Sequence, residues 1–142
     1  MIRTVIVDDE EPARAKLRRW LEREPDMAIA GEFADGLGAA QSIMSGSADL
    51  VFLDIQIPGL DGLQLASQLE PETSPLVVFV TAYDAHALAA FDLNAVDYLL
   101  KPYDNERFQR TLDRVRSRFR AADARGSAVR MARTQSVARS RD

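Results

Sequence analysis

Short runs of apolar, often β-branched residues alternate along the chain with segments in which apolar residues recur every three or four positions. The short runs predict five β-strands, at Arg3–Val7, Ala28–Phe33, Leu50–Leu53, Leu76–Val80 and Ala95–Leu100. Several of these runs are apolar throughout instead of alternating, which is typical of parallel strands covered on both faces. The pattern therefore indicates a parallel sheet whose strands are joined by helices.

The intervening segments predict five helices, at Glu11–Arg23, Leu37–Met44, Leu63–Leu69, Ala85–Phe91 and Asn105–Arg120. The first of them can accommodate Pro12, because a backbone N–H in the first turn has no partner within the helix. The last has an apolar stripe on one side, formed by Phe108, Leu112, Val115 and Phe119. Five strand–helix units before residue 120 predict one compact α/β domain with a doubly wound parallel sheet.

The pattern weakens after Arg120. Residues 121–142 are rich in Ala, Arg and Ser with scattered apolar residues, so they either prolong the last helix or, as we expect, form a basic linker or frayed tail. Residues 1–120 carry 13 Lys and Arg against 20 Asp and Glu, a net charge of −7, whereas residues 121–142 carry +3. An acidic body repels nucleic-acid phosphates and is a poor nucleic-acid binder, and a basic tail that could touch nucleic acid is more often a plain linker.

The composition excludes several classes of protein. The chain has no cysteine, which rules out disulfides, thiol catalysis and thiolate metal sites, and is compatible with the cytoplasm, where we expect the protein. Its N-terminus meets acidic residues after a very short apolar run, unlike a signal peptide. No apolar stretch approaches the roughly 20 residues of a membrane-spanning helix.

Polar side chains follow four of the predicted strands. Asp8 and Asp9 follow the first, Asp54 the third, Thr81 the fourth and Lys101 the fifth. Open α/β sheets bind ligands at the carboxyl ends of their strands, so we expect these groups to lie together. Three adjacent carboxylates repel one another unless a cation lies among them, and oxygen ligands without His or Cys favour Mg²⁺. A carboxylate held between Mg²⁺ and the Lys101 ammonium is well placed to attack a phosphorus centre.

Each of these residues alone has a simpler explanation. One of the Asp8–Asp9 pair, or Thr81, can cap a helix. Asp54 precedes a Pro-Gly turn and can be a turn former, and Lys101 alone can be a surface charge. Their occurrence together at successive strand ends favours the functional interpretation.

Four segments that contain these residues resemble the signature segments of response-regulator receiver domains of two-component systems. They are VIVDDEE, LVFLDIQIPGLDG, VVFVTAYD and AVDYLLKPY, in the order and spacing of that family. The resemblance covers residues 1–120 and implies a flavodoxin-like fold with strand order 2-1-3-4-5. The segment TAYDAHALAAFDLNAVDYLLKPYD is most similar to receivers of LytTR-type transcription regulators, which implies a LytTR DNA-binding effector after a linker.

The resemblance implies a role for each site residue. Asp54 would accept a phosphoryl group from a sensor histidine kinase or a small acyl phosphate. Mg²⁺ would be held by Asp8, Asp9, Asp54 and the backbone carbonyl of Gln56. Phosphorylation would be sensed by Thr81, Lys101 and Tyr98, although an aromatic residue late in a core strand is more often packing. The Lys101–Pro102 bond would be cis, and the surface of the fourth helix, fifth strand and fifth helix would form a homodimer.

Two further residues are expected to tune turnover of the phosphoryl group. Gln56 and Tyr83 each lie two residues after a site residue, where side chains of this family overhang the phosphoryl group. A bulky Tyr83 should hinder an attacking water, which predicts slow self-dephosphorylation. Gln56 also argues against a phosphatase of the haloacid-dehalogenase type, because that class of enzyme has a second Asp at this position as its acid and base.

We therefore expect a signalling switch that is no enzyme beyond its own phosphoryl transfer and dephosphorylation. A degenerate, phosphate-independent binding module is the remaining alternative, and the complete set of site residues disfavours it. The effector is absent from these 142 residues, and we favour truncation within a linker over a stand-alone receiver.

Overall fold

A computed structural model describes residues 1–57, 75–82 and 95–140 of the chain, with side chains up to Ala122. The expected helices at Leu63–Leu69 and Ala85–Phe91, and Tyr83 with them, lie outside these residues.

Five parallel strands form one sheet in the order β2-β1-β3-β4-β5, as the family resemblance implies. Their bounds are β1 (Ile2–Val7), β2 (Met27–Phe33), β3 (Leu50–Leu53), β4 (Leu76–Thr81) and β5 (Asp97–Leu100). Strand β1 pairs with β2 on one side and with β3 on the other. The strand order therefore reverses between β1 and β3, and in open α/β sheets this switch point is where ligands bind.

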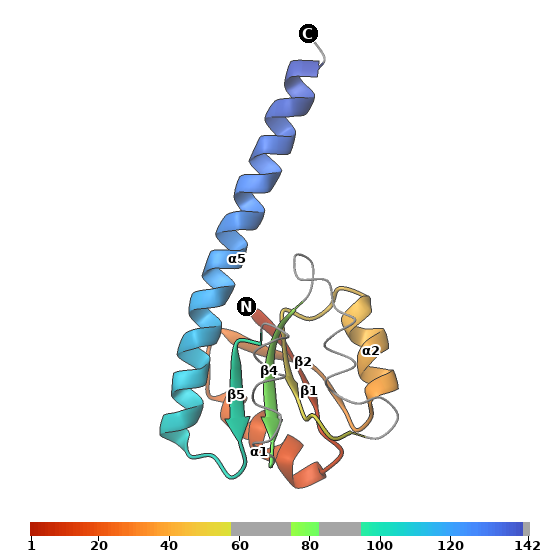
Figure 1. The fold of residues 1–142 in the computed structure, drawn as a ribbon, viewed down its shortest axis with the longest axis vertical. Helices are drawn as coiled ribbons and strands as arrows, with labels where there is room; N and C mark the ends of the chain where they lie inside the picture. The colour runs from red at the N-terminus through yellow and green to blue at the C-terminus, as the bar shows by residue number, and fades with distance from the viewer. Residues whose placement is uncertain (58–74, 83–94, 141–142) are drawn as a thin grey trace.

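Both faces of the sheet are covered, so the core has two halves. Helices α1 (Glu11–Glu22) and α5 (Asn105–Ser140) pack on one face, and helix α2 (Gly36–Met44) packs on the other (Figure 1). The first half contains Leu17 and Leu21 of α1 and the predicted stripe of α5, in which Phe108, Leu112 and Val115 are fully buried. The second half contains Ala39 and Ile43 of α2. Two-sided burial explains why most strands are apolar throughout.

Local chemistry fixes the ends of α2. The Asp35 carboxylate accepts a hydrogen bond of 2.9 Å from the Gly38 N–H, which makes Asp35 the N-cap. The chain leaves α2 through Gly46, whose φ of +79° is accessible to glycine at little cost. The helix begins one residue before the predicted Leu37 and ends at the predicted Met44.

Helix α5 is much longer than predicted. It does not end at Arg120 but continues without interruption to Ser140, and its last turns project away from the sheet (Figure 1). The backbone of residues 121–140 therefore follows the alternative in which the segment prolongs the last helix, and its role as a basic linker stays a prediction. Ala and Arg favour helix and the segment has no proline, so Gly126 is the residue that opposes its continuation most.

Candidate functional site

The ends of β1 and β3 bring two carboxylates together. Val7 and Leu53 are partners in the parallel ladder, and the backbone N–H of Asp54 donates to the Val7 carbonyl at 2.9 Å. Asp8 and Asp54 therefore leave neighbouring strands at the same level of the sheet. Their exposed fractions are 1% and 7%.

Asp9 completes a cluster of three carboxylates. Asp8, Asp9 and Asp54 each offer a carboxylate oxygen, and these oxygens lie within 4.8 Å of one another. Asp9 is exposed, so the cluster is buried on one side and open to solvent on the other. Hard oxygen donors, partial burial and one open side suit Mg²⁺, which retains several waters. The three side chains therefore fit the ion that the sequence implies.

Lys101 lies against the two buried carboxylates. Its Nζ donates to Asp8 Oδ2 at 2.7 Å and to Asp54 Oδ2 at 3.3 Å. Its backbone N–H donates to the Thr81 carbonyl at 2.7 Å, and the bond to Pro102 is cis. The ends of β4 and β5 thus place one ammonium between the ends of β1 and β3.

Burial and charge act in opposite directions on the two partners of this contact. Burial raises the pKa of Asp54, as does the charge of Asp8, whereas the Gln56 N–H and Lys101 act to lower it. Burial acts to lower the pKa of Lys101, but the hydrogen bond and charge of Asp8 outweigh it, so this pKa is raised. The ammonium is therefore held firmly in its charged form beside a carboxylate that burial makes more basic.

The other predicted site residues surround this centre. Thr81 is fully buried at the end of β4. Tyr98 is half-buried in β5 and packs against the α2-side core, with its hydroxyl oxygen buried. Gln56 is exposed, and its backbone N–H donates to Asp54 Oδ1 at 3.0 Å.

Arg14 is a residue at the site that sequence reasoning missed. Its guanidinium Nη1 donates to the Asp8 carbonyl at 2.7 Å, and the Glu10 N–H donates to Asp8 Oδ1 at 2.9 Å. The segment between β1 and α1 is therefore fixed from both sides. The spacing of one arginine in an arginine-rich helix gives no signal of this role.

A second missed feature is a buried ion-pair network between β5 and α5. Asp97 accepts hydrogen bonds from Arg107, Thr111 and Arg114 at 2.7–2.9 Å. Burial acts to raise the pKa of Asp97, but the hydrogen bonds from Arg107 and Thr111 outweigh it and lower the pKa to about 2. The network fixes the start of β5 against α5.

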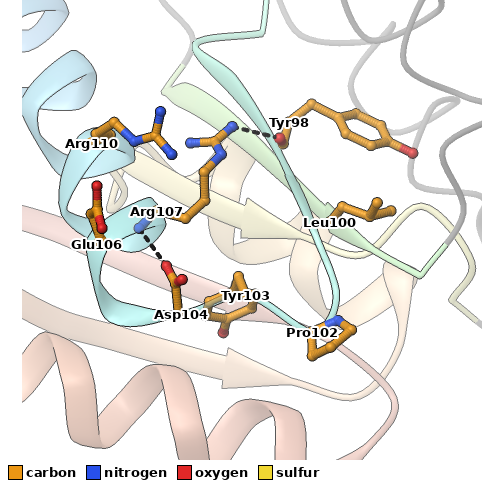
Figure 2. A pocket seen from close by; sticks show the side chains of 8 residues that line it. All are labelled: Tyr98, Leu100, Pro102, Tyr103, Asp104, Glu106, Arg107 and Arg110. Atoms are coloured by element: carbon orange, nitrogen blue, oxygen red, sulfur yellow. Dashed lines mark hydrogen bonds between the residues drawn. The ribbon is translucent and has the colours of Figure 1, made fainter.

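A pocket of about 360 Å³ lies beside this network (Figure 2). Its lining combines the exposed Leu100 with Pro102 and charged residues of α5, including Arg107 and Arg110. Arg107 also donates to the Tyr98 carbonyl at 3.0 Å, so the pocket borders the strand of the expected aromatic switch.

Comparison with known proteins assigns the family. Residues 4–113 match the model of the response regulator receiver domain. The chain is 50% identical over 115 residues to an uncharacterized response regulatory protein of Yersinia pestis, and this match covers 81% of the chain and 48% of the relative. It is 44% identical over 119 residues to the transcriptional regulatory protein BtsR of Escherichia coli K12, covering 82% of the chain and 48% of BtsR.

A solved structure supports the same assignment. The crystal structure of the response regulatory domain of protein MrkE from Klebsiella pneumoniae is 37% identical, with a TM-score of 0.78, covering 84% of this chain and 99% of that one. The chain belongs to the receiver-domain family of two-component response regulators. It spans about half the length of the curated relatives it matches. Among the described residues, no helix has both the length and the apolar character needed to cross a membrane.

Proposed function

We propose that the protein is a phosphorylation-dependent signalling switch in which Asp54 accepts the phosphoryl group from a sensor histidine kinase or a small acyl phosphate. The observation that carries the proposal is the position of the Asp54 carboxylate, which is buried beside Asp8, near Asp9 and in contact with Lys101. Isolated surface aspartates have no such surroundings. The family to which the chain belongs supports the same function.

Phosphoryl transfer to Asp54 is a simple displacement. An Asp54 oxygen forms a bond to phosphorus, the bond from phosphorus to the donor breaks, and the donor leaves with that electron pair. Lys101 offsets negative charge on Asp54 and on the incoming phosphoryl oxygens. Mg²⁺, held by Asp8, Asp9, Asp54 and the Gln56 carbonyl, would supply further charge stabilisation and orientation. Burial of Asp54 on one side limits the directions from which a donor can approach.

Two side chains are proposed to sense the product. Thr81 would bond to the phosphoryl group, and Tyr98 would move inward behind it. Tyr98 already packs on the α2-side core, and its carbonyl is tied to Arg107 of α5. A change at Tyr98 would therefore reach the β5–α5 surface, which we propose pairs with a second copy on phosphorylation.

The output is proposed to be transcription control through a LytTR-type DNA-binding domain in the part of the protein beyond these 142 residues. The similarity to BtsR, which is named a transcriptional regulatory protein, supports this proposal. Residues 1–120 would form the receiver and the basic residues 121–142 its connection to the effector. The phosphorylated state would be long-lived, because Gln56 offers no acid or base for hydrolysis and Tyr83 is expected to hinder water.

Incubation with acetyl phosphate and Mg²⁺ tests this function without knowledge of the kinase. We expect the intact mass to increase by one phosphoryl group and the size in solution to change toward a dimer. Asp54→Ala should gain no mass, whereas Glu22→Ala, which alters an exposed residue at the end of α1, should behave like the wild type. A wild-type protein that gains no mass would point to a phosphate-independent binding module.

A further inference from the structure

The chain uses lysine at only two positions, against sixteen arginines. One lysine, Lys101, belongs to the segment of residues 101–104, which we name the β5–α5 loop, and the other, Lys16, contacts it. Lys101 begins this loop and reaches into the acidic site. Lys16 belongs to α1, on the face of the sheet where α5 also packs. The second lysine therefore meets the loop from a separate element.

The ammonium of the partly buried Lys16 contacts one carbonyl and two aromatic rings. Its Nζ donates to the Tyr103 carbonyl at 2.9 Å, and it lies 3.8 Å from the Tyr103 ring centroid and 4.6 Å from that of Trp20. Trp20 in turn meets the Tyr103 ring edge-on at 5.6 Å. A compact ammonium suits a space between two rings and a carbonyl, where it combines a cation–π contact with hydrogen bonding.

These contacts hold the middle of the loop, between two other attachments. At its start, the Lys101 N–H is bound to the Thr81 carbonyl. At its end, the Asp104 carboxylate accepts from the Arg107 N–H at 2.8 Å and caps α5 (Figure 2). Lys16 fixes Tyr103 between them, and the Tyr103 side chain is itself buried. The backbone of the β5–α5 loop is therefore held at Lys101 itself and at two points that follow it in the chain.

We propose that Lys16 is a positioning residue for Asp54 phosphorylation, because it holds the β5–α5 loop where the Lys101 ammonium meets Asp8 and Asp54. The inference rests on the proposed function of Asp54. Lys101 contacts Asp8 at 2.7 Å but Asp54 at 3.3 Å, so a small displacement of the loop weakens the second contact first. Catalytic groups are sensitive to such displacements, since a misplacement of about 1 Å can cost about 100-fold in rate.

Three variants separate this role from general packing. Lys16→Met keeps the length of the side chain but removes its charge and its donor, whereas Lys16→Arg keeps both. Arg19→Met removes a charge from an exposed position of the same helix and is the matched control. For each variant, the rate of phosphorylation by acetyl phosphate is measured by intact mass, and the Mg²⁺ dependence of thermal unfolding is measured separately.

We expect Lys16→Met to be phosphorylated about tenfold more slowly than wild type, and Lys16→Arg to stay within about threefold of it. The Mg²⁺ dependence should be unchanged in both, because neither alters an acidic ligand. Arg19→Met should match the wild type. Equal rates for Lys16→Met and wild type would overturn the inference while leaving the function of Asp54 intact. A wild-type protein without phosphorylation would instead contradict the proposed function.

A further variant keeps the inference testable if Lys16→Met does not fold. Lys16→Gln can still donate to the Tyr103 carbonyl but offers no charge to the two rings. We expect its phosphorylation rate to lie between those of Lys16→Arg and Lys16→Met. If Lys16→Met does not fold, we expect the Lys16→Gln rate to be below that of Lys16→Arg. A Lys16→Gln rate equal to that of the wild type would overturn the role of the ammonium.

Discussion

At the scale of single residues, the three carboxylates of the acidic cluster are partly buried, and their negative charges need compensation. Asp8 and Asp54 are buried against each other, and Lys101 provides one positive charge between them. One ammonium cannot offset three carboxylates, because Asp9 lies within the same 4.8 Å cluster. The excess negative charge of the cluster therefore favours binding of a divalent cation to the folded protein.

Mg²⁺ should therefore stabilise the fold. A ligand that binds only the folded state at a hundredfold excess over its Kd adds about 2.7 kcal/mol to the free energy of unfolding. We expect urea unfolding of the wild type to shift by this order when Mg²⁺ is saturating. Asp9→Asn should lose most of the shift, whereas Asp113→Asn should retain it. An equal shift in Asp9→Asn would argue against these metal ligands.

Tyr83 carries a second prediction at this scale, made from the sequence alone. If its side chain hinders an attacking water, then Tyr83→Ala should lose its phosphoryl group faster than the wild type, by about tenfold. The decay of the phosphorylated form is followed by intact mass after removal of acetyl phosphate. Equal decay rates in the two proteins would contradict the prediction that Tyr83 hinders the attacking water.

At the scale of elements, β5 and α5 are joined by a buried carboxylate. Asp97 lies among Arg107, Thr111 and Arg114, and only 4% of its side chain is exposed. Removing Arg107 or Arg114 leaves Asp97 with other partners, and their side chains are 29% and 58% exposed, so the cost is below the roughly 3–5 kcal/mol of a fully buried pair. The strand and helix that border the Figure 2 pocket are therefore fixed to each other independently of the acidic site.

This network predicts a stability change in acid. The pKa of Asp97 is lowered to about 2 from a usual value of 3.8, so its contribution is present above pH 4 and is lost as the pH falls toward 2. The contribution is about 2 kcal/mol, since each unit of pKa shift corresponds to about 1.4 kcal/mol. Urea unfolding from pH 6 to pH 2.5 measures it, and Asp97→Asn should show a correspondingly weaker pH dependence in this range. Parallel curves for the two proteins would contradict the assignment.

The elements also show what the sequence could and could not predict. Strand positions followed from apolar runs because two-sided burial leaves a strong pattern, as in β3, where all four residues are buried. The carboxylate cluster followed because parallel strands end at one edge of the sheet. The contacts of Arg14 and Lys16 could not be predicted, because they depend on how α1 lies over the sheet and on the path of the β5–α5 loop. Nothing in their spacing distinguishes them from surface charges.

At the scale of the whole molecule, α5 joins a packed receiver to a projecting helix. Its first turns are held by Phe108 and Leu112 in the core and by Arg116, which pairs with Glu24 and Asp26. The last turns extend beyond the sheet (Figure 1). A continuous helix of this kind can carry a change in the receiver away from the sheet.

Truncation after Ala122 should therefore affect helix content more than stability. We expect the truncated protein to unfold within about 0.5 kcal/mol of the longer chain, because the backbone of the removed turns projects away from the sheet (Figure 1). Far-UV circular dichroism should show a loss of helix that matches the missing residues. A loss of stability above about 2 kcal/mol would show that the projecting part of α5 packs on the receiver or on a second copy.

The central claim is that Asp54 carries the phosphoryl group, and identifying the modified residue tests it most directly. The protein is phosphorylated with acetyl phosphate and Mg²⁺, treated with hydroxylamine, which converts an acyl phosphate to a hydroxamate, and digested for peptide mass analysis. We predict a single hydroxamate at Asp54, and no phosphoryl gain in Asp54→Asn. A hydroxamate on another residue, or an equal phosphoryl gain in Asp54→Asn, would contradict the account.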